Sequence, residues 1–135
     1  MLAVSTSSNA QAGASLNLLC QVNGEITGIS ASPNPMPKIP INGAISVLVE
    51  NGFIDISDTN NYFSAKMPVK IETDRIFGGA QWRGEDDADN KLLIEINRNT
   101  GMLRVSKEKS FIKSSIFLDA KASGNCEKLA NRRKF

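Results

Sequence analysis

Two cysteines are the residues whose type and spacing say most about the chemistry open to this 135-residue chain. Cys20 and Cys126 stand near opposite ends, and the sequence contains no other cysteine and no histidine. A zinc site takes its ligands mostly from Cys and His, and a nucleophilic thiol needs a base such as His. In an oxidising compartment two distant cysteines most simply form a disulfide, with two buried free thiols as the alternative. We therefore predict a disulfide that closes most of the chain into one loop.

The sequence offers few residues that could support enzymatic chemistry. Without His, general acid and base roles would fall to carboxylates, Lys or Tyr62. Serine triads and histidine-based metal centres are excluded, and the sequence has no Walker-type phosphate loop. A glycosidase-like pair of carboxylates stays open as the last-ranked alternative, since the spacing selects no particular pair. We expect a protein that binds without catalysis and without a cofactor.

Charge and the start of the chain bear on partners and location. The 16 basic and 14 acidic residues nearly balance, which argues against a nucleic-acid partner. No apolar run approaches the ~20 residues of a transmembrane helix. Residues 1–12 end in Ala10-Gln11-Ala12, a signal-peptidase site of A-x-A type, although the charged and long apolar regions of a full signal are missing. We expect a signal remnant or disordered tail over residues 1–15, one β domain over 16–135, and a periplasmic or secreted location.

Two Asn-Gly pairs predict β-hairpins, because this dipeptide supplies the positive φ angles of a type I′ turn. Asn23-Gly24 separates the apolar residues 16–22 from 25–31, and Asn51-Gly52 separates 44–50 from 53–57. Between the two hairpins, residues 32–40 hold four of the five prolines. Proline lacks a backbone donor, so this run predicts an extended loop rather than a central strand.

The rest of the chain also has the pattern of an all-β protein. The glycine-rich residues 75–84 predict a bend or bulge, and residues 127–135 a short helix or docked tail. Turn signals recur about every ten residues, and no segment shows a helical period. The sequence therefore predicts an antiparallel β-sandwich or small β-barrel of about eight or nine short strands. Further strands are expected over residues 62–66, 69–74, 91–97, 102–106 and 111–121.

Four residues in the middle of the chain are candidates for a binding surface. Trp82 is flanked by Arg83, and Tyr62 and Phe77 are the aromatic residues grouped with them. An exposed aromatic beside an arginine makes a good interface anchor, although aromatics at strand spacing also pack in cores. The adjacent acidic residues 85–90 predict a solvated hairpin tip, with a weak Ca²⁺ site as the alternative.

A set of short motifs resembles a group of small exported bacterial proteins of uncharacterised function. The motifs are Cys20, the turn Asn97-Arg98-Asn99-Thr100-Gly101 after Ile96, the segment Gly124-Asn125-Cys126, and a basic end with Arg133, Lys134 and Phe135. The resemblance covers the last third of the chain plus Cys20. It implies a periplasmic or secreted β-protein and carries no catalytic residues to transfer.

These observations favour an exported, inhibitor-like binding module of the bacterial envelope, with another envelope protein as partner. The alternative is a lipocalin-like carrier whose barrel encloses a small apolar ligand. A filled core with an exposed Trp82 would favour the module, and a large enclosed cavity would favour the carrier. A monomer is the default, and edge strands leave a dimer open.

Overall fold

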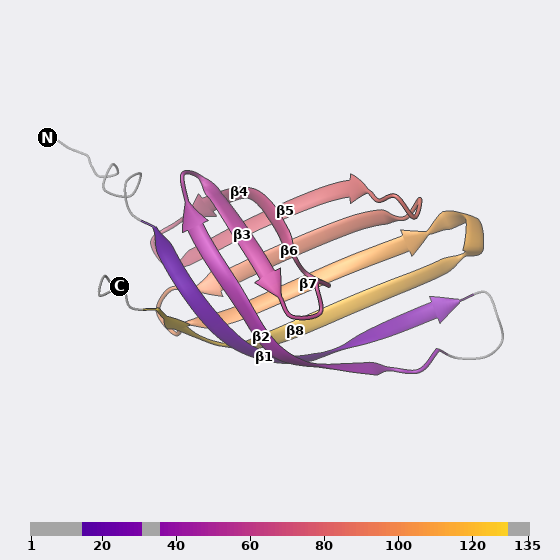
Figure 1. Cartoon of the computed structure of the whole chain (residues 1–135), viewed down its shortest axis with the longest axis horizontal. Coiled ribbons are helices and arrows are strands. Elements are labelled where there is room, and N and C mark those ends of the chain that lie inside the picture. Colours follow the sequence, from indigo (N-terminus) through magenta and orange to yellow (C-terminus); the bar gives the residue numbers. More distant parts are fainter. Residues whose placement is uncertain (1–14, 31–35, 130–135) are drawn as a thin grey trace, which may run out of the picture.

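The computed structural model describes residues 15–30 and 36–129, which form eight strands and one short 3₁₀ helix (Figure 1). Within these residues no helix has the length and apolar character needed to span a bilayer. The predicted tail up to residue 14, residues 31–35 of the proline-rich run and the end from 130 lie outside the described residues. The elements are β1 (Leu16–Ser30), β2 (Ile39–Glu50), β3 (Phe53–Asp58), β4 (Ala65–Ile71), β5 (Arg75–Arg83), β6 (Asp89–Asn97), β7 (Met102–Phe111), η1 (Ile112–Ser114) and β8 (Ile116–Lys128).

The strands close into a single antiparallel barrel in chain order. Each strand pairs with the next, and β8 returns to pair with β1 from Leu18↔Lys128 to Ser30↔Ile116. Cys20 lies directly opposite Cys126 in this last pairing, and a disulfide joins them. The predicted disulfide and all-β fold are confirmed, and the architecture is the barrel rather than the sandwich.

The core fills the barrel because alternate side chains of each strand point inward. Val47, Ile54, Leu92 and Leu103 are 0% exposed. Phe63, from the loop between β3 and β4, joins them as the largest of the fully buried side chains. The apolar residues that drive closure therefore come from both the strands and one connecting loop.

The hairpin predicted around Asn51-Gly52 is confirmed as β2 and β3. Asn51 has a φ of 54° and Gly52 a φ of 83°, the two positive angles that a type I′ turn requires. The pairing runs from Glu50↔Phe53 next to the turn as far as Ile45↔Asp58.

The hairpin predicted around Asn23-Gly24 is wrong, because β1 runs through both residues without turning. Gly24 lies opposite Ala122 on β8. A Cβ atom at position 24 would overlap the Lys121 carbonyl oxygen. The glycine therefore permits a close approach of two strands, a role that glycine also takes inside strands. The first hairpin consists instead of β1 and β2, which places Pro40 of the predicted loop inside β2.

The strand predicted over residues 62–66 begins later than expected, at Ala65. The Asp58 carboxylate accepts hydrogen bonds from the backbone N–H groups of Tyr62 (2.9 Å) and Phe63 (3.0 Å) and from the Ser64 hydroxyl (2.8 Å). These bonds hold residues 59–64 in a loop. The strand then continues through Pro68 and ends at Ile71, so β4 joins the end of the strand predicted over residues 62–66 to the start of the one predicted over 69–74.

The later strands are longer than predicted. From Arg75 to Arg83 each β5 residue has one partner on β6 in unbroken register, so the predicted bulge is wrong. Gly78 faces the core, where a Cβ would lie 3.0 to 3.2 Å from atoms of β3 and β4. β7 reaches Phe111, and β8 begins only after η1 and extends through Lys128, into the segment predicted as a helix or tail.

The barrel is fully closed over only part of its length, because β3 and β4 are short (Figure 1). β2 pairs with β3 only over residues 45–50, and β4 pairs with β5 only from Val69↔Gly78 to Ile71↔Ile76. Beyond these pairs, residues 39–44 of β2 and 79–83 of β5 have a strand neighbour on one side only among the described residues. The other strands continue past this point as a curved sheet.

Candidate binding groove

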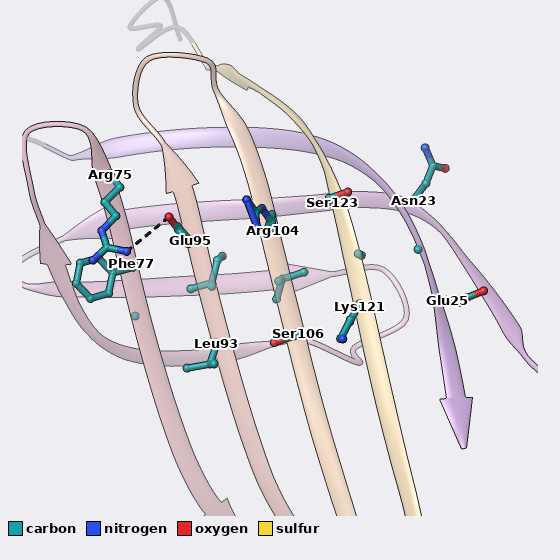
Figure 2. A pocket seen from close by; sticks show the side chains of 15 residues that line it. Asn23, Glu25, Arg75, Phe77, Leu93, Glu95, Arg104, Ser106, Lys121 and Ser123 are labelled. Atoms are coloured by element: carbon teal, nitrogen blue, oxygen red, sulfur yellow. Dashed lines mark ion pairs between the residues drawn. The ribbon is translucent and has the colours of Figure 1, made fainter. Parts of the chain in front are cut away.

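A groove of about 630 Å³ lies on the outer face of the barrel, across β5, β6, β7, β8 and β1 (Figure 2). The strand registers arrange its floor in cross-strand rows. One row contains Phe77, Glu95, Arg104, Ser123 and Asn23, and the next contains Gly79, Leu93, Ser106, Lys121 and Glu25.

Small residues in these rows keep the floor of the groove low. Ser106 and Ser123 line the groove and present only hydroxymethyl groups between the longer side chains. Two glycines also bring β1 and β8 close together, since a Cβ at Gly124 would overlap the Gln21 carbonyl oxygen, as one at Gly24 would overlap that of Lys121. Figure 1 shows that β1 bends in its middle, where these contacts lie. The hollow therefore results from side-chain size together with strand curvature.

The β5 and β6 side of the groove holds two apolar side chains beside an ion pair. Leu93 is 48% exposed, an unusual position for a leucine on a strand face, and Phe77 is half-buried beside it. The Arg75 guanidinium lies 4.2 Å from the centre of the Phe77 ring. It also pairs with Glu72 at 3.0 Å and Glu95 at 3.6 Å, and the Glu72 hydrogen bond in particular raises the pKa of Arg75. Arg75 is thus held by its neighbours and covers one face of the aromatic ring.

The β7 and β8 side of the groove presents cations and hydroxyls. Arg104 and Lys121 lie on a diagonal of the two strands, and Ser106 and Ser123 occupy the other diagonal. Lys121 makes one long, exposed contact with Asp119 at 3.6 Å. Arg104 has no ion pair with any residue in the described part of the chain. Two cations beside two hydroxyl donors are well suited to hold a carboxylate, which accepts several hydrogen bonds.

The rows continue along the same outer face into a second hollow of about 410 Å³. Its lining includes Gln81, Lys91 and Glu108, which form the row after Gly79 and Leu93. Phe117 of β8 lies at its far side. The outer face of β5 to β8 therefore offers a track with apolar residues at both ends and charged residues between them.

The four residues predicted as a binding surface do not form one surface. Phe77 alone faces the large groove. Trp82 and Arg83 stand at the unpaired end of β5, where Trp82 is 37% exposed. Tyr62 belongs to the loop between β3 and β4 and is partly buried against the core. Sequence spacing could not place them, because it does not say which face of a strand each side chain occupies.

Lys107 links Tyr62 and Trp82 on the inner side of the sheet and was missed by the sequence analysis. Its ammonium group donates a hydrogen bond to the Tyr62 carbonyl oxygen at 2.7 Å. It lies 4.7 Å from the Tyr62 ring centre and 5.6 Å from that of Trp82. Burial lowers the pKa of Lys107. Its position two residues after the inward-facing Val105 was the signal that could have revealed it.

The Tyr62 hydroxyl is buried and has no hydrogen-bond partner among the described residues. Burial, together with the negative charge of Asp119, raises the pKa of Tyr62. Both Tyr62 and Lys107 are therefore partly withdrawn from water on the inner face of the sheet, away from the groove.

The acidic residues 85–90 lie in the β5–β6 turn and at the start of β6, and three of them, Asp86, Asp87 and Asp89, pair with cations. Asp87 contacts Arg83 and Lys113, each at 3.1 Å, and Lys109 contacts Asp86 at 2.7 Å. These hydrogen-bonded cations lower the pKa of both Asp86 and Asp87. Across residues 15–30 and 36–129 no group of three or more Cys, Asp or Glu residues has the arrangement of a metal site.

Comparison with protein-family models, with curated proteins and with solved structures gives no significant match for this chain.

Proposed function

We propose that the protein is an exported binding module of the bacterial envelope, which acts without catalysis and contacts a partner protein through the outer groove. The observation that carries this proposal is a concave surface that combines the exposed, apolar Leu93 with Arg104, a cation without an ion pair among the described residues. A concave surface with apolar residues and a few converging polar groups is the usual form of a binding site.

The groove chemistry suggests what the partner presents. An apolar side chain would lie over Leu93 and Phe77, where it would remove apolar surface from water. A carboxylate next to it would lie between Arg104 and Lys121, with Ser106 and Ser123 as further donors. We infer that the partner offers an extended segment in which an acidic residue neighbours an apolar one.

The barrel interior supports this proposal over a lipocalin-like carrier. A carrier needs internal space for its ligand, but Val47, Ile54, Leu92 and Leu103 fill the interior with side chains that are 0% exposed. The barrel architecture alone is compatible with a carrier, and the hollows described above open on the outside.

Export is supported by the disulfide between Cys20 and Cys126. Structural disulfides persist in oxidising compartments and are rare in the cytosol of ordinary bacteria. The signal-peptidase motif at Ala10-Gln11-Ala12 agrees with this inference, although it lies outside the described residues.

Site-specific photocrosslinking in the native host tests the proposal. A benzophenone amino acid is placed at Leu93 in the groove or, as a matched control, at Phe53, which is 42% exposed on β3. We expect one discrete envelope-protein adduct from position 93 and none from position 53. Arg104→Glu should abolish this adduct, whereas Lys66→Glu on β4 should leave it unchanged. Equal adducts from both positions, or an adduct indifferent to Arg104→Glu, would contradict the proposal.

A further inference from the structure

Residues 79–83 of β5 form a strand edge that takes no part in the groove described above. They pair with β6 on one side and have no strand on the other among the described residues. Hydrogen-bonding direction alternates along a strand, and Gly84 donates to Ala88 on the β6 side at 2.9 Å. Residues 80 and 82 therefore direct their backbone groups toward β6, and residues 79, 81 and 83 direct theirs toward the open edge. In the described part of the chain no backbone bond reaches this edge beyond the last β4 pair, Val69↔Gly78.

Proline explains why the β4–β5 ladder stops at this point. Continuing the register by one residue would place Pro68 opposite Gly79. Pro68 has no N–H to donate, so the next bond of the ladder cannot form. β4 then continues beside β3 alone, and Figure 1 shows it diverging from β5.

The two free edges of the sheet differ in their protection. The β2 edge contains Pro40, which removes a donor from the strand and discourages pairing with another chain. Residues 79–83 of β5 contain no proline. An unprotected strand edge is a template for another extended segment.

We propose that β5 pairs antiparallel with β5 of a second copy of this chain, across a two-fold axis at Gln81. The sequence Gly79-Ala80-Gln81-Trp82-Arg83 is self-complementary in that register. Trp82 lies opposite Ala80 of the partner subunit, so a large side chain meets a small one. Arg83 lies opposite Gly79 of the partner subunit, where no side chain obstructs it. Gln81 lies opposite its own copy, and the two amides can hydrogen-bond.

The backbone also fits this register. Residues 79, 81 and 83 all face the edge, so Gln81 forms a hydrogen-bonded pair with its copy and Gly79 forms one with Arg83 in each half. Residues 80 and 82 occupy the non-hydrogen-bonded positions, where facing side chains come closest. Arg83 keeps its own ion pairs with Asp87 (3.1 Å) and Asp89 (2.9 Å), so its charge is already balanced in each copy.

Sedimentation equilibrium of the full disulfide-bonded chain tests the dimer. We expect a concentration-dependent dimer for the wild type. Gln81→Glu should weaken dimerisation about tenfold or more, because two like charges would face each other across the axis. The variant should still fold, since position 81 lies opposite Lys91 on β6 and a glutamate can pair with it. Asn42→Glu places the same charge on the β2 edge and should not change the dissociation constant.

Disulfide trapping tests the register. In a hydrogen-bonded antiparallel pair the Cα atoms lie about 5.5 Å apart, within the range that a disulfide spans. Oxidised Gln81→Cys should therefore form a covalent dimer, and Asn42→Cys should not. A wild-type monomer at all concentrations, a dimer indifferent to Gln81→Glu, or equal trapping of both cysteine variants would overturn the proposal. So would a monomer that instead binds an unrelated extended peptide at this edge.

Discussion

Tyr62 shows how one polar atom can lower the stability of an otherwise well-packed core. Its hydroxyl is buried without a hydrogen-bond partner among the described residues, while its backbone is held by Asp58 and by Lys107. The backbone contacts therefore fix the position of the side chain at the expense of its hydroxyl group. This arrangement stabilises the folded state only if burial of the aromatic ring contributes more free energy than the unsatisfied hydroxyl group costs.

Tyr62→Phe should increase the free energy of unfolding at neutral pH by about 1 kcal/mol, because it removes an unsatisfied buried hydroxyl and keeps the ring. Urea denaturation followed by circular dichroism measures the change. A loss of more than about 1 kcal/mol would mean that the hydroxyl has a partner in the folded protein.

The same variant has a pH signature. Because the folded pKa of Tyr62 is raised above 10.0, the folded state keeps its proton when the unfolded state loses it. Wild-type stability should therefore fall as pH rises above 10, and the Tyr62→Phe protein should lack this contribution. Lys107 titrates in both proteins, so the difference between their stability curves isolates Tyr62. Parallel curves up to alkaline pH would contradict the assignment.

At the scale of strands, the Asn-Gly pairs at positions 23–24 and 51–52 explain how far the sequence could predict this fold. Asn51-Gly52 acts locally, through its own φ angles, and its hairpin was predicted correctly. Gly24 acts through a contact with β8, about a hundred residues away in sequence, and no local pattern carries that information. The same dipeptide therefore forms a turn at one position and lies within a strand at the other. Only the pairing of strands distant in sequence distinguishes the two cases.

The groove was harder to predict than the strands, because it depends on register between five of them. Phe77 was expected at a binding surface and does line the groove, but Arg104 and Leu93 carried no distinguishing local signal. Shifting any of these strands by one residue would turn its groove side chains to the other face. The alternation of each strand was readable from the sequence, whereas the alignment of neighbouring strands was not.

The close contact between β1 and β8 can be tested through Gly124. Gly124→Ala should destabilise the protein by about 1 to 3 kcal/mol, since the added Cβ would overlap the Gln21 carbonyl oxygen and force the strands apart. Gly43→Ala on β2 is the matched control, because a Cβ there meets nothing within 4 Å. Thermal and urea unfolding compare the two. Equal effects of both substitutions would show that β1 and β8 do not require glycine.

For the molecule as a whole, the disulfide joins the first and last strands at the point where the barrel closes. Cys20 and Cys126 are separated by 106 residues in sequence. A cross-link across so long a loop restricts the unfolded chain strongly in the chain-entropy account, and native disulfides typically contribute about 2 to 5 kcal/mol.

The double variant Cys20→Ala, Cys126→Ala should lose stability in that range, and wild-type protein in reductant should lose a similar amount. Urea denaturation with and without dithiothreitol measures both. The double variant itself should not respond to dithiothreitol. A wild-type transition that reductant leaves unchanged, under conditions where mass spectrometry shows both thiols alkylated, would contradict the prediction.

Because the first strand pairs with the last, the order of synthesis limits when the barrel can close. While the ribosome is still adding residues, β1 has only β2 as a neighbour, and its other side waits for the final strand. The barrel cannot be completed until β8 has emerged, because Ala120 and Ala122 of that strand supply part of the core. A partly synthesised chain thus carries an exposed strand edge for most of its synthesis, a state prone to aggregation. Only the complete chain can therefore pair both sides of β1.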